Sequence, residues 1–247
     1  MCYIIPEMEL KTNKKKVVVI VGPTASGKSD LGIKIAKKFG GEIISADSRQ
    51  VYRGMDIGTG KVTKKEQKTI RHHLIDVASP KKQFTAPDFK RLGEKAIKDI
   101  LARNKIPIIV GGTGFYIDTL IGRMTIVPVP PNKQLRVKLE KQSAEQLFKQ
   151  LVKMDSHYSR IIDRHNRRRL IRALEIVLTT GRPMPKRSSD TKYNILWLGV
   201  KPRNLKKRIE NRLDRRFGNG IVKEVEKLHN PPAGGGVSWK RLDDFGL

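Results

Sequence analysis

Short apolar runs alternate with amphipathic stretches in the first half of the chain. The runs Lys16–Val21 and Ile106–Val110 are continuous and apolar, which is typical of strands buried on both faces of a parallel sheet. Glu42–Ala46 predicts a third strand. Between the strands, the helical period predicts helices over Lys28–Phe39 and Thr85–Arg103. This alternation predicts an α/β fold with a doubly wound parallel sheet.

The pattern changes after Gly122. A proline-rich break is followed by amphipathic stretches that predict helices over Lys133–Val152 and Asn166–Thr180, with no strand between them. The pattern at Asn194–Val200 again predicts a strand, and the helical period resumes after it. We therefore predict an α/β core formed by residues 14–122 and 191–247, interrupted by a helical insertion over residues 123–190.

Two further helices are predicted after the last strand, over Leu205–Phe217 and Ile221–Leu228. In the first of them, Leu205, Ile209 and Leu213 recur every four residues. This spacing predicts a face that packs into the core, with arginines on the neighbouring face.

The charge of the chain favours a polyanionic partner. Lys and Arg number 52 against 24 Asp and Glu, which gives a formal net charge of +28. Nucleic acid is the first candidate, and an acidic membrane surface is the second. Arginine, which binds phosphate through two parallel hydrogen bonds, is concentrated in Arg164–Arg172 and Lys206–Arg216.

Targeting features are weak in this sequence. No apolar stretch approaches the roughly 20 residues of a spanning helix, and the first residues lack the apolar region of a secretory signal. Cys2 is the only cysteine, so no internal disulfide can form. We expect a cytoplasmic protein without a membrane segment, and nothing in the sequence calls for an obligate oligomer, so a monomer is expected.

A phosphate-binding motif follows the first strand and opens the first helix. Its glycines let backbone N–H groups turn inward around an anion, and the helix N-terminus adds partial positive charge. Lys28 adds a full charge, and the Ser29 hydroxyl can ligate Mg²⁺. The motif predicts a site for a polyphosphate or a diphosphate without naming the ligand. Its residues are Gly22, Pro23, Thr24, Ala25, Ser26, Gly27, Lys28 and Ser29.

Asp47 is the carboxylate that directly follows a predicted strand. In doubly wound sheets, ligands bind beyond the carboxyl ends of the strands. Asp47 could therefore hold Mg²⁺ or act as a base near the phosphate site. The alternative is a purely local role, in which Asp47 forms an Asx-turn with Ser48.

Several motifs occur together in one order along the chain. They are GPTASGKS at Gly22–Ser29, DSRQVYRGMDIGTGK at Asp47–Lys61, HHLID at His72–Asp76, VGGTGFY at Val110–Tyr116, NRRRLIRALE at Asn166–Glu175 and RIENRLDRRFGNGIVKEV at Arg208–Val225. With these motifs, the chain resembles the tRNA dimethylallyltransferase family, also called tRNA isopentenyltransferases. The resemblance extends over roughly residues 16–228.

The resemblance implies a reaction and its participants. The family transfers a dimethylallyl group from dimethylallyl diphosphate to the exocyclic amine of adenosine 37, next to the anticodon, and releases diphosphate. The implied partners are this donor and the tRNA anticodon stem-loop, with Mg²⁺ as cofactor. The phosphate-binding motif would hold the diphosphate of the donor.

The resemblance also implies roles for single residues. Asp47 would be the general base, Thr113 would lie near the reacting amine, and Lys28 and Arg212 would act on the diphosphate. Mg²⁺ would be bound at Ser29. The implied tRNA contacts are Asp47, Ser48, Arg49, Gln50, Thr113, Arg136, Arg168, Arg169, Leu170, Ile171 and Arg172.

Two other functions are compatible with parts of the sequence. A kinase for a small metabolite or nucleoside would use the same phosphate motif, with Asp47 as the base for a hydroxyl. A non-catalytic RNA-binding protein would keep the motif only as an anion site. The arginine-rich insertion argues against the kinase, because a small acceptor does not require it.

Overall fold

The computed structural model describes residues 2–5, 14–231 and 234–246. The chain divides into two compact units, one formed by Met1–Gly122 with Asp190–Leu247 and the other by Arg123–Ser189. We call the first the sheet unit and the second the helical unit. In the described part of the chain, no helix is both long enough and apolar enough to span a bilayer.

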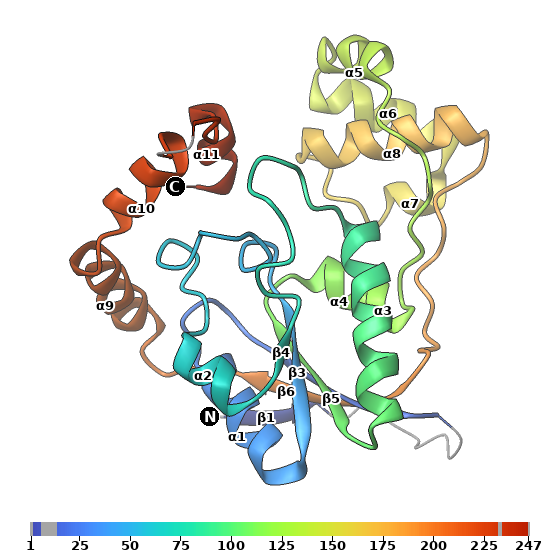
Figure 1. Ribbon diagram of the computed structural model, residues 1–247. Helices are drawn as coiled ribbons and strands as arrows, with labels where there is room; N and C mark the ends of the chain where they lie inside the picture. Colours follow the sequence, from blue (N-terminus) through green and yellow to red (C-terminus); the bar gives the residue numbers. More distant parts are fainter. Residues whose placement is uncertain (1, 6–13, 232–233, 247) are drawn as a thin grey trace. The chain divides into compact units, whose positions relative to one another are not determined.

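The sheet unit contains a six-stranded sheet with the order β1-β6-β2-β5-β3-β4 (Figure 1). Strand β1 pairs antiparallel with β6, and the other neighbouring strands are parallel. The predicted α/β fold with a parallel sheet is confirmed. The strands are β1 (Cys2–Ile5), β2 (Lys16–Val21), β3 (Gly41–Ala46), β4 (His72–His73), β5 (Ile106–Gly111) and β6 (Asn194–Val200).

Helices cover both faces of the sheet because alternate strand residues point to opposite sides. On one face, Val17 and Val19 of β2 pack with Phe89 of α3, while on the other Ile20 packs with Ala36 of α1. The helices of this unit are α1 (Lys28–Phe39), α2 (Lys64–Thr69), α3 (Ala86–Ala102), α4 (Gly114–Ile121), α9 (Leu205–Gly218), α10 (Ile221–His229) and α11 (Trp239–Phe245).

Helix α9 departs from the sequence prediction. None of its residues is buried, and Ile209 and Leu213 are 45% and 48% exposed. The prediction that this face packs into the core is therefore wrong. The helical period does place these apolar residues on one face, but no element of the described chain buries it.

The helical unit packs four helices around a leucine-rich core. Leu139, Leu147, Leu170 and Leu174 are all buried there. The single helix predicted over Lys133–Val152 is wrong, because two helices occupy this segment. The helices are α5 (Lys133–Glu140), α6 (Ala144–Met154), α7 (Ser156–Ser159) and α8 (Arg167–Thr180).

Candidate active site

The phosphate motif forms the turn between β2 and α1. Gly22 has no room for a side chain, because an added Cβ would lie 2.5 Å from the carbonyl oxygen of Val200. Ala25 has a φ of +61°, a left-handed conformation that non-glycine residues rarely adopt. Gly27, with a φ of +94°, then begins α1. A turn of this kind aims successive N–H groups at one point, which suits an anion.

Polar side chains of this turn are placed for a ligand. The Nζ of Lys28 donates a hydrogen bond to the carbonyl of Pro23 at 2.6 Å. Burial lowers the pKa of Lys28, the charge of Asp47 opposes this, and the charge of Arg212 lowers it further. The Oγ of Ser26 is buried and has no hydrogen-bond partner among the described residues. Buried polar atoms are normally paired, so this hydroxyl fits a ligand oxygen.

Asp47 follows β3 and is oriented by the turn it begins. Its Oδ1 accepts hydrogen bonds from the backbone N–H groups of Arg49 at 2.8 Å and Gln50 at 3.3 Å. The Asx-turn alternative is thus present in the structure. It leaves Oδ2 without a hydrogen bond from the described residues. The Oγ1 of Thr113 accepts the N–H of Ser48 at 3.3 Å and so ties this turn to the start of α4.

Asp47 and the phosphate motif share a cavity of about 300 Å³, which we call the Asp47 cavity. Lys28, Ser29 and Arg212 line it together with Asp47. The same three residues also line a neighbouring cavity of about 480 Å³ against the phosphate motif, which we call the P-loop cavity. Arg49 and Gln50 line the Asp47 cavity as well. The predicted base and the predicted diphosphate ligands are therefore brought together.

Arginines from α9 reach the phosphate motif and the loop beside it. The Nε of Arg208 donates to the carbonyl of Ala25 at 2.8 Å, and Arg208 lines the P-loop cavity. Arg212 donates to the carbonyls of Thr59 at 3.3 Å and Gly60 at 3.1 Å. An added Cβ on Gly60 would lie only 1.9 Å from the Arg212 guanidinium, so this glycine makes the contact possible. The sequence analysis predicted an arginine face on this helix but did not assign Arg208 to the site, although it lies four residues before Arg212.

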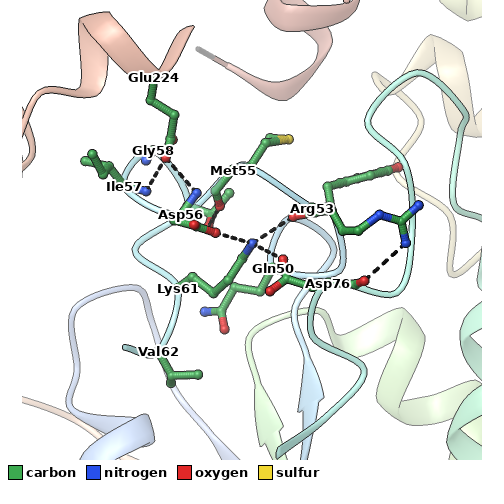
Figure 2. Close-up of polar contacts among 12 residues, drawn as sticks. Gln50, Arg53, Met55, Asp56, Ile57, Gly58, Lys61, Val62, Asp76 and Glu224 are labelled. Atoms are coloured by element: carbon green, nitrogen blue, oxygen red, sulfur yellow. Dashed lines mark hydrogen bonds and ion pairs between the residues drawn. The ribbon is translucent and has the colours of Figure 1, made fainter. Parts of the chain in front are cut away.

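Lys61 anchors the loop before α2 from inside the protein. Its side chain is 2% exposed. Its Nζ donates to the carbonyl of Tyr52 at 2.8 Å and forms ion pairs with Asp56 at 2.6 Å and Asp76 at 2.5 Å (Figure 2). The two carboxylates compensate the buried ammonium group, which would otherwise be costly.

Glu224 of α10 holds the same loop from the other side. Its carboxylate accepts the backbone N–H groups of Asp56 and Ile57 at 2.8 Å and of Gly58 at 2.9 Å (Figure 2). Gly58 lines the Asp47 cavity. Sequence reasoning missed Glu224, because its partners lie 166–168 positions away along the chain. It also missed Lys61, because the sequence pattern does not show that this lysine is buried.

In the helical unit, two of the predicted tRNA-contacting arginines share one buried carboxylate. Arg136 donates to both oxygens of Glu175 at 2.8 Å, and Arg172 donates to it at 2.6 Å. Burial raises the pKa of Glu175, but the hydrogen bonds from these arginines and from the N–H of Asn132 together lower it to about 2. Both arginines remain about one-third exposed.

The remaining predicted contacts in α8 differ in exposure. Arg168 and Arg169 are exposed, and their side chains have no ion pair with a described residue. Leu170 and Ile171 are 0% and 8% exposed and pack in the leucine-rich core. Any RNA contact of these last two residues would therefore use their backbone.

The described residues offer two places for a cation. Glu42, His73 and Asp99 lie close enough to share one. However, Arg103 and Lys105 already pair with Glu42 there, and their hydrogen bonds and that of His73 hold its pKa well below the usual range, although burial opposes them. This cluster is an ion-pair network. In the Asp47 cavity, Ser29 and Asp47 offer oxygen atoms, the donor type that Mg²⁺ prefers.

Comparison with known proteins assigns the chain to a family. A family model described as IPP transferase matches residues 50–242. The chain belongs to the IPP transferase family. The tRNA dimethylallyltransferase of Thermomicrobium roseum is 44% identical over 225 residues, which cover 87% of this chain and 68% of that protein. The one from Anoxybacillus flavithermus is 41% identical, with 87% and 71% covered.

Solved structures of IPP transferases agree with this fold. The tRNA isopentenylpyrophosphate transferase of Staphylococcus epidermidis is 41% identical with a TM-score of 0.57, covering 87% of this chain and 73% of that one. The corresponding Bacillus halodurans enzyme is 36% identical with a TM-score of 0.62, covering 94% and 78%. A eukaryotic dimethylallyltransferase described as acting on tRNA is 33% identical with a TM-score of 0.73, covering 87% and 56%.

Proposed function

We propose that this chain transfers the dimethylallyl group of dimethylallyl diphosphate to the exocyclic amine of adenosine 37 in tRNA, releasing diphosphate. The observation that carries the proposal is the shared cavity of Asp47, Lys28, Ser29 and Arg212. It combines a carboxylate with cationic groups for a diphosphate. The relatives of the chain, which are named tRNA dimethylallyltransferases, supply the substrate class.

The chemistry follows from the charges in this cavity. The adenine amine is a weak nucleophile, because its lone pair is delocalised into the ring. As nitrogen bonds to the first prenyl carbon, the carbon–oxygen bond breaks and its electron pair leaves with the diphosphate. The Oδ2 of Asp47 accepts the amine proton. Lys28, Arg212 and the backbone N–H groups of the phosphate turn stabilise the charge that develops on the leaving group.

Asp47 is held in place for this role by its own turn. The N–H groups of Arg49 and Gln50 donate to Oδ1, which fixes the orientation of the carboxylate and therefore the direction of Oδ2. Thr113 acts through the same turn, because its hydroxyl accepts the N–H of Ser48. A placement of Thr113 beside the amine is part of the proposal.

Ser29 would hold Mg²⁺, with its hydroxyl as a ligand and diphosphate oxygens as further ligands. When bound, the ion would neutralise part of the charge on the diphosphate. The proposal is supported by the cavity linings, because Ser29 lines both the Asp47 cavity and the P-loop cavity together with Lys28 and Arg212.

The helical unit is proposed to grip the anticodon stem-loop. Arg168 and Arg169 present exposed guanidinium groups for phosphates, and Glu175 fixes the orientation of Arg136 and Arg172. The target base must leave its stack to reach Asp47, and a separate grip on the RNA offsets that cost. We also propose a cytoplasmic location, because the acceptor is tRNA, and a monomeric state, which light scattering would measure.

The test uses two variants of Asp47. Asp47→Asn keeps an oxygen acceptor for the N–H groups of Arg49 and Gln50 but removes the base, whereas Asp47→Ala removes both. We expect both variants to lose about 10²–10⁴-fold in prenyl transfer, measured by mass analysis of tRNA nucleosides. Binding of inorganic pyrophosphate to Asp47→Asn should be retained.

Three outcomes would overturn the proposal. Unchanged transfer by Asp47→Asn would exclude Asp47 as the base. Phosphoryl transfer from ATP to a small acceptor, without a prenyl donor, would favour a kinase. Tight tRNA binding without any product from the unaltered protein would favour a non-catalytic RNA-binding role.

A further inference from the structure

Arg216 is the third of three arginines spaced four residues apart on α9. Arg208 and Arg212, which precede it, both donate to backbone carbonyls around the phosphate site. Arg216 lines the Asp47 cavity together with Arg212. It lies one helical turn further along the same side of α9, so its side chain enters the cavity next to that of Arg212.

The side chain of Arg216 lacks a partner in the described chain. Its Nε is buried and donates no hydrogen bond there, and no carboxylate of the described residues pairs with the guanidinium. Burial lowers the pKa of Arg216, the charge of Arg212 lowers it further, and the charges of Asp47 and Glu224 oppose this. A buried N–H of a cationic group that bonds to nothing is costly and uncommon in a folded protein.

The charges around the Asp47 cavity explain what this side chain would bind. Its described lining includes the cations Lys28, Arg49, Arg212 and Arg216 but the single carboxylate Asp47. Lys28, Arg49 and Arg212 each donate to a backbone carbonyl. Neutral carbonyls leave the positive charge uncompensated. The cavity therefore favours an anion with more than one negative charge, and Arg216 has a free donor for it.

We propose that Arg216 is a further diphosphate-binding residue, whose Nε and terminal N–H groups donate to oxygens of the donor's diphosphate and of the released product. The inference rests on the proposed function and extends it to a residue outside the phosphate motif. An RNA phosphate is the alternative anion. The cavity favours the diphosphate, because Arg216 shares it with Lys28, Ser29 and Arg212 of the phosphate site.

The experiment compares Arg216→Gln and Arg216→Lys with a matched control, Lys207→Gln. Lys207 is exposed on the same helix and lines none of the cavities described here, so its variant removes the same charge away from the site. Calorimetry with inorganic pyrophosphate measures binding without catalysis. We expect Arg216→Gln to weaken binding about tenfold or more, because charge-assisted hydrogen bonds are lost. Arg216→Lys should fall between Arg216→Gln and the unaltered protein, and Lys207→Gln should leave binding unchanged.

Kinetics and RNA binding separate the outcomes. The KM for dimethylallyl diphosphate should rise in Arg216→Gln, while the Kd for tRNA stays within about twofold. Unchanged pyrophosphate binding with weaker tRNA binding would overturn the inference in favour of an RNA phosphate contact. Equal losses of pyrophosphate binding in Arg216→Gln and Lys207→Gln would also overturn it, because they would show that only the net charge of the protein matters. If the unaltered protein neither bound pyrophosphate nor transferred the prenyl group, the proposed function itself would fail.

Discussion

The arginines of the helical unit and those of α9 differ in what holds them. Arg136 and Arg172 share the buried carboxylate of Glu175. Arg212 rests on two backbone carbonyls, and Arg216 has no partner among the described residues. The charges of Arg136 and Arg172 are thus neutralised in part by a carboxylate, whereas Arg212 and Arg216 keep their full charge.

This difference separates two uses of arginine. A buried carboxylate that pairs with two guanidinium groups must keep both partners, because an unpaired buried charge is expensive. Such arginines stabilise the fold, and the carboxylate also fixes the direction of their exposed N–H groups. An arginine on neutral carbonyls contributes less to folding and retains its attraction for a polyanion.

The largest expected effect is on the helical unit when Glu175 is removed. Glu175→Ala leaves Arg136 and Arg172 without their shared carboxylate, so we expect a loss of about 3–5 kcal/mol in the free energy of unfolding. Hydrogen exchange of the α8 amides measures this loss in the unit itself. The control is Glu145→Ala, which breaks an exposed pair with Lys149 and should change nothing measurable. Equal protection of α8 in both variants would contradict the comparison.

Acid should weaken the same unit by a similar or smaller amount. The pKa of Glu175 is lowered from 4.5 to about 2, so the folded state holds fewer protons than the unfolded state between these values. Its contribution, on the order of 3 kcal/mol, is complete above about pH 4.5 and is lost as the pH falls through 2. Denaturant unfolding at several acidic pH values measures the slope. Glu175→Gln should flatten it, and an unchanged slope would show that other carboxylates cause it.

The smallest effect on folding is expected at Arg212. Arg212→Gln removes hydrogen bonds of 3.1 and 3.3 Å to two carbonyls, so the free energy of unfolding should change by less than about 1 kcal/mol. Pyrophosphate binding should nevertheless weaken about tenfold or more, because a charged donor is lost. A loss of stability as large as that of Glu175→Ala would make this arginine structural and erase the contrast between the two regions.

Local patterns predicted the central strands and the longer helices of the sheet unit, but not β1, β4, α2, α4 or α11. The predicted ranges Lys16–Val21 and Lys28–Phe39 coincide with β2 and α1, because a continuous apolar run and glycine turns mark their ends. The helical unit was harder. The apolar period continues across the break between α5 and α6, since helices on both sides pack into one core. The capping box of Ser143 and Gln146 was the local signal for the second helix.

The candidate site was predictable only where one short segment carries it. The phosphate motif, Asp47 and Arg212 lie in recognisable patterns, and the structure brings them to one cavity. The roles of Lys61, Glu224 and Arg216 arise from tertiary contacts that no local pattern encodes. Ile209 and Leu213 illustrate the same limit, because a helical period identifies an apolar face but not whether anything packs on it.

The grip of Glu224 on the loop at residues 56–58 has a consequence for synthesis on the ribosome. The carboxylate follows those N–H groups by 166–168 positions. A nascent chain that has emerged only through β5 already contains the phosphate turn and Asp47, yet its loop still lacks this clamp, and β6 is missing from beside β2. Because domains fold as their residues emerge, the phosphate pocket matures late in translation. A ligand of this pocket can therefore bind and stabilise only chains in which α9 and α10 have already been synthesised.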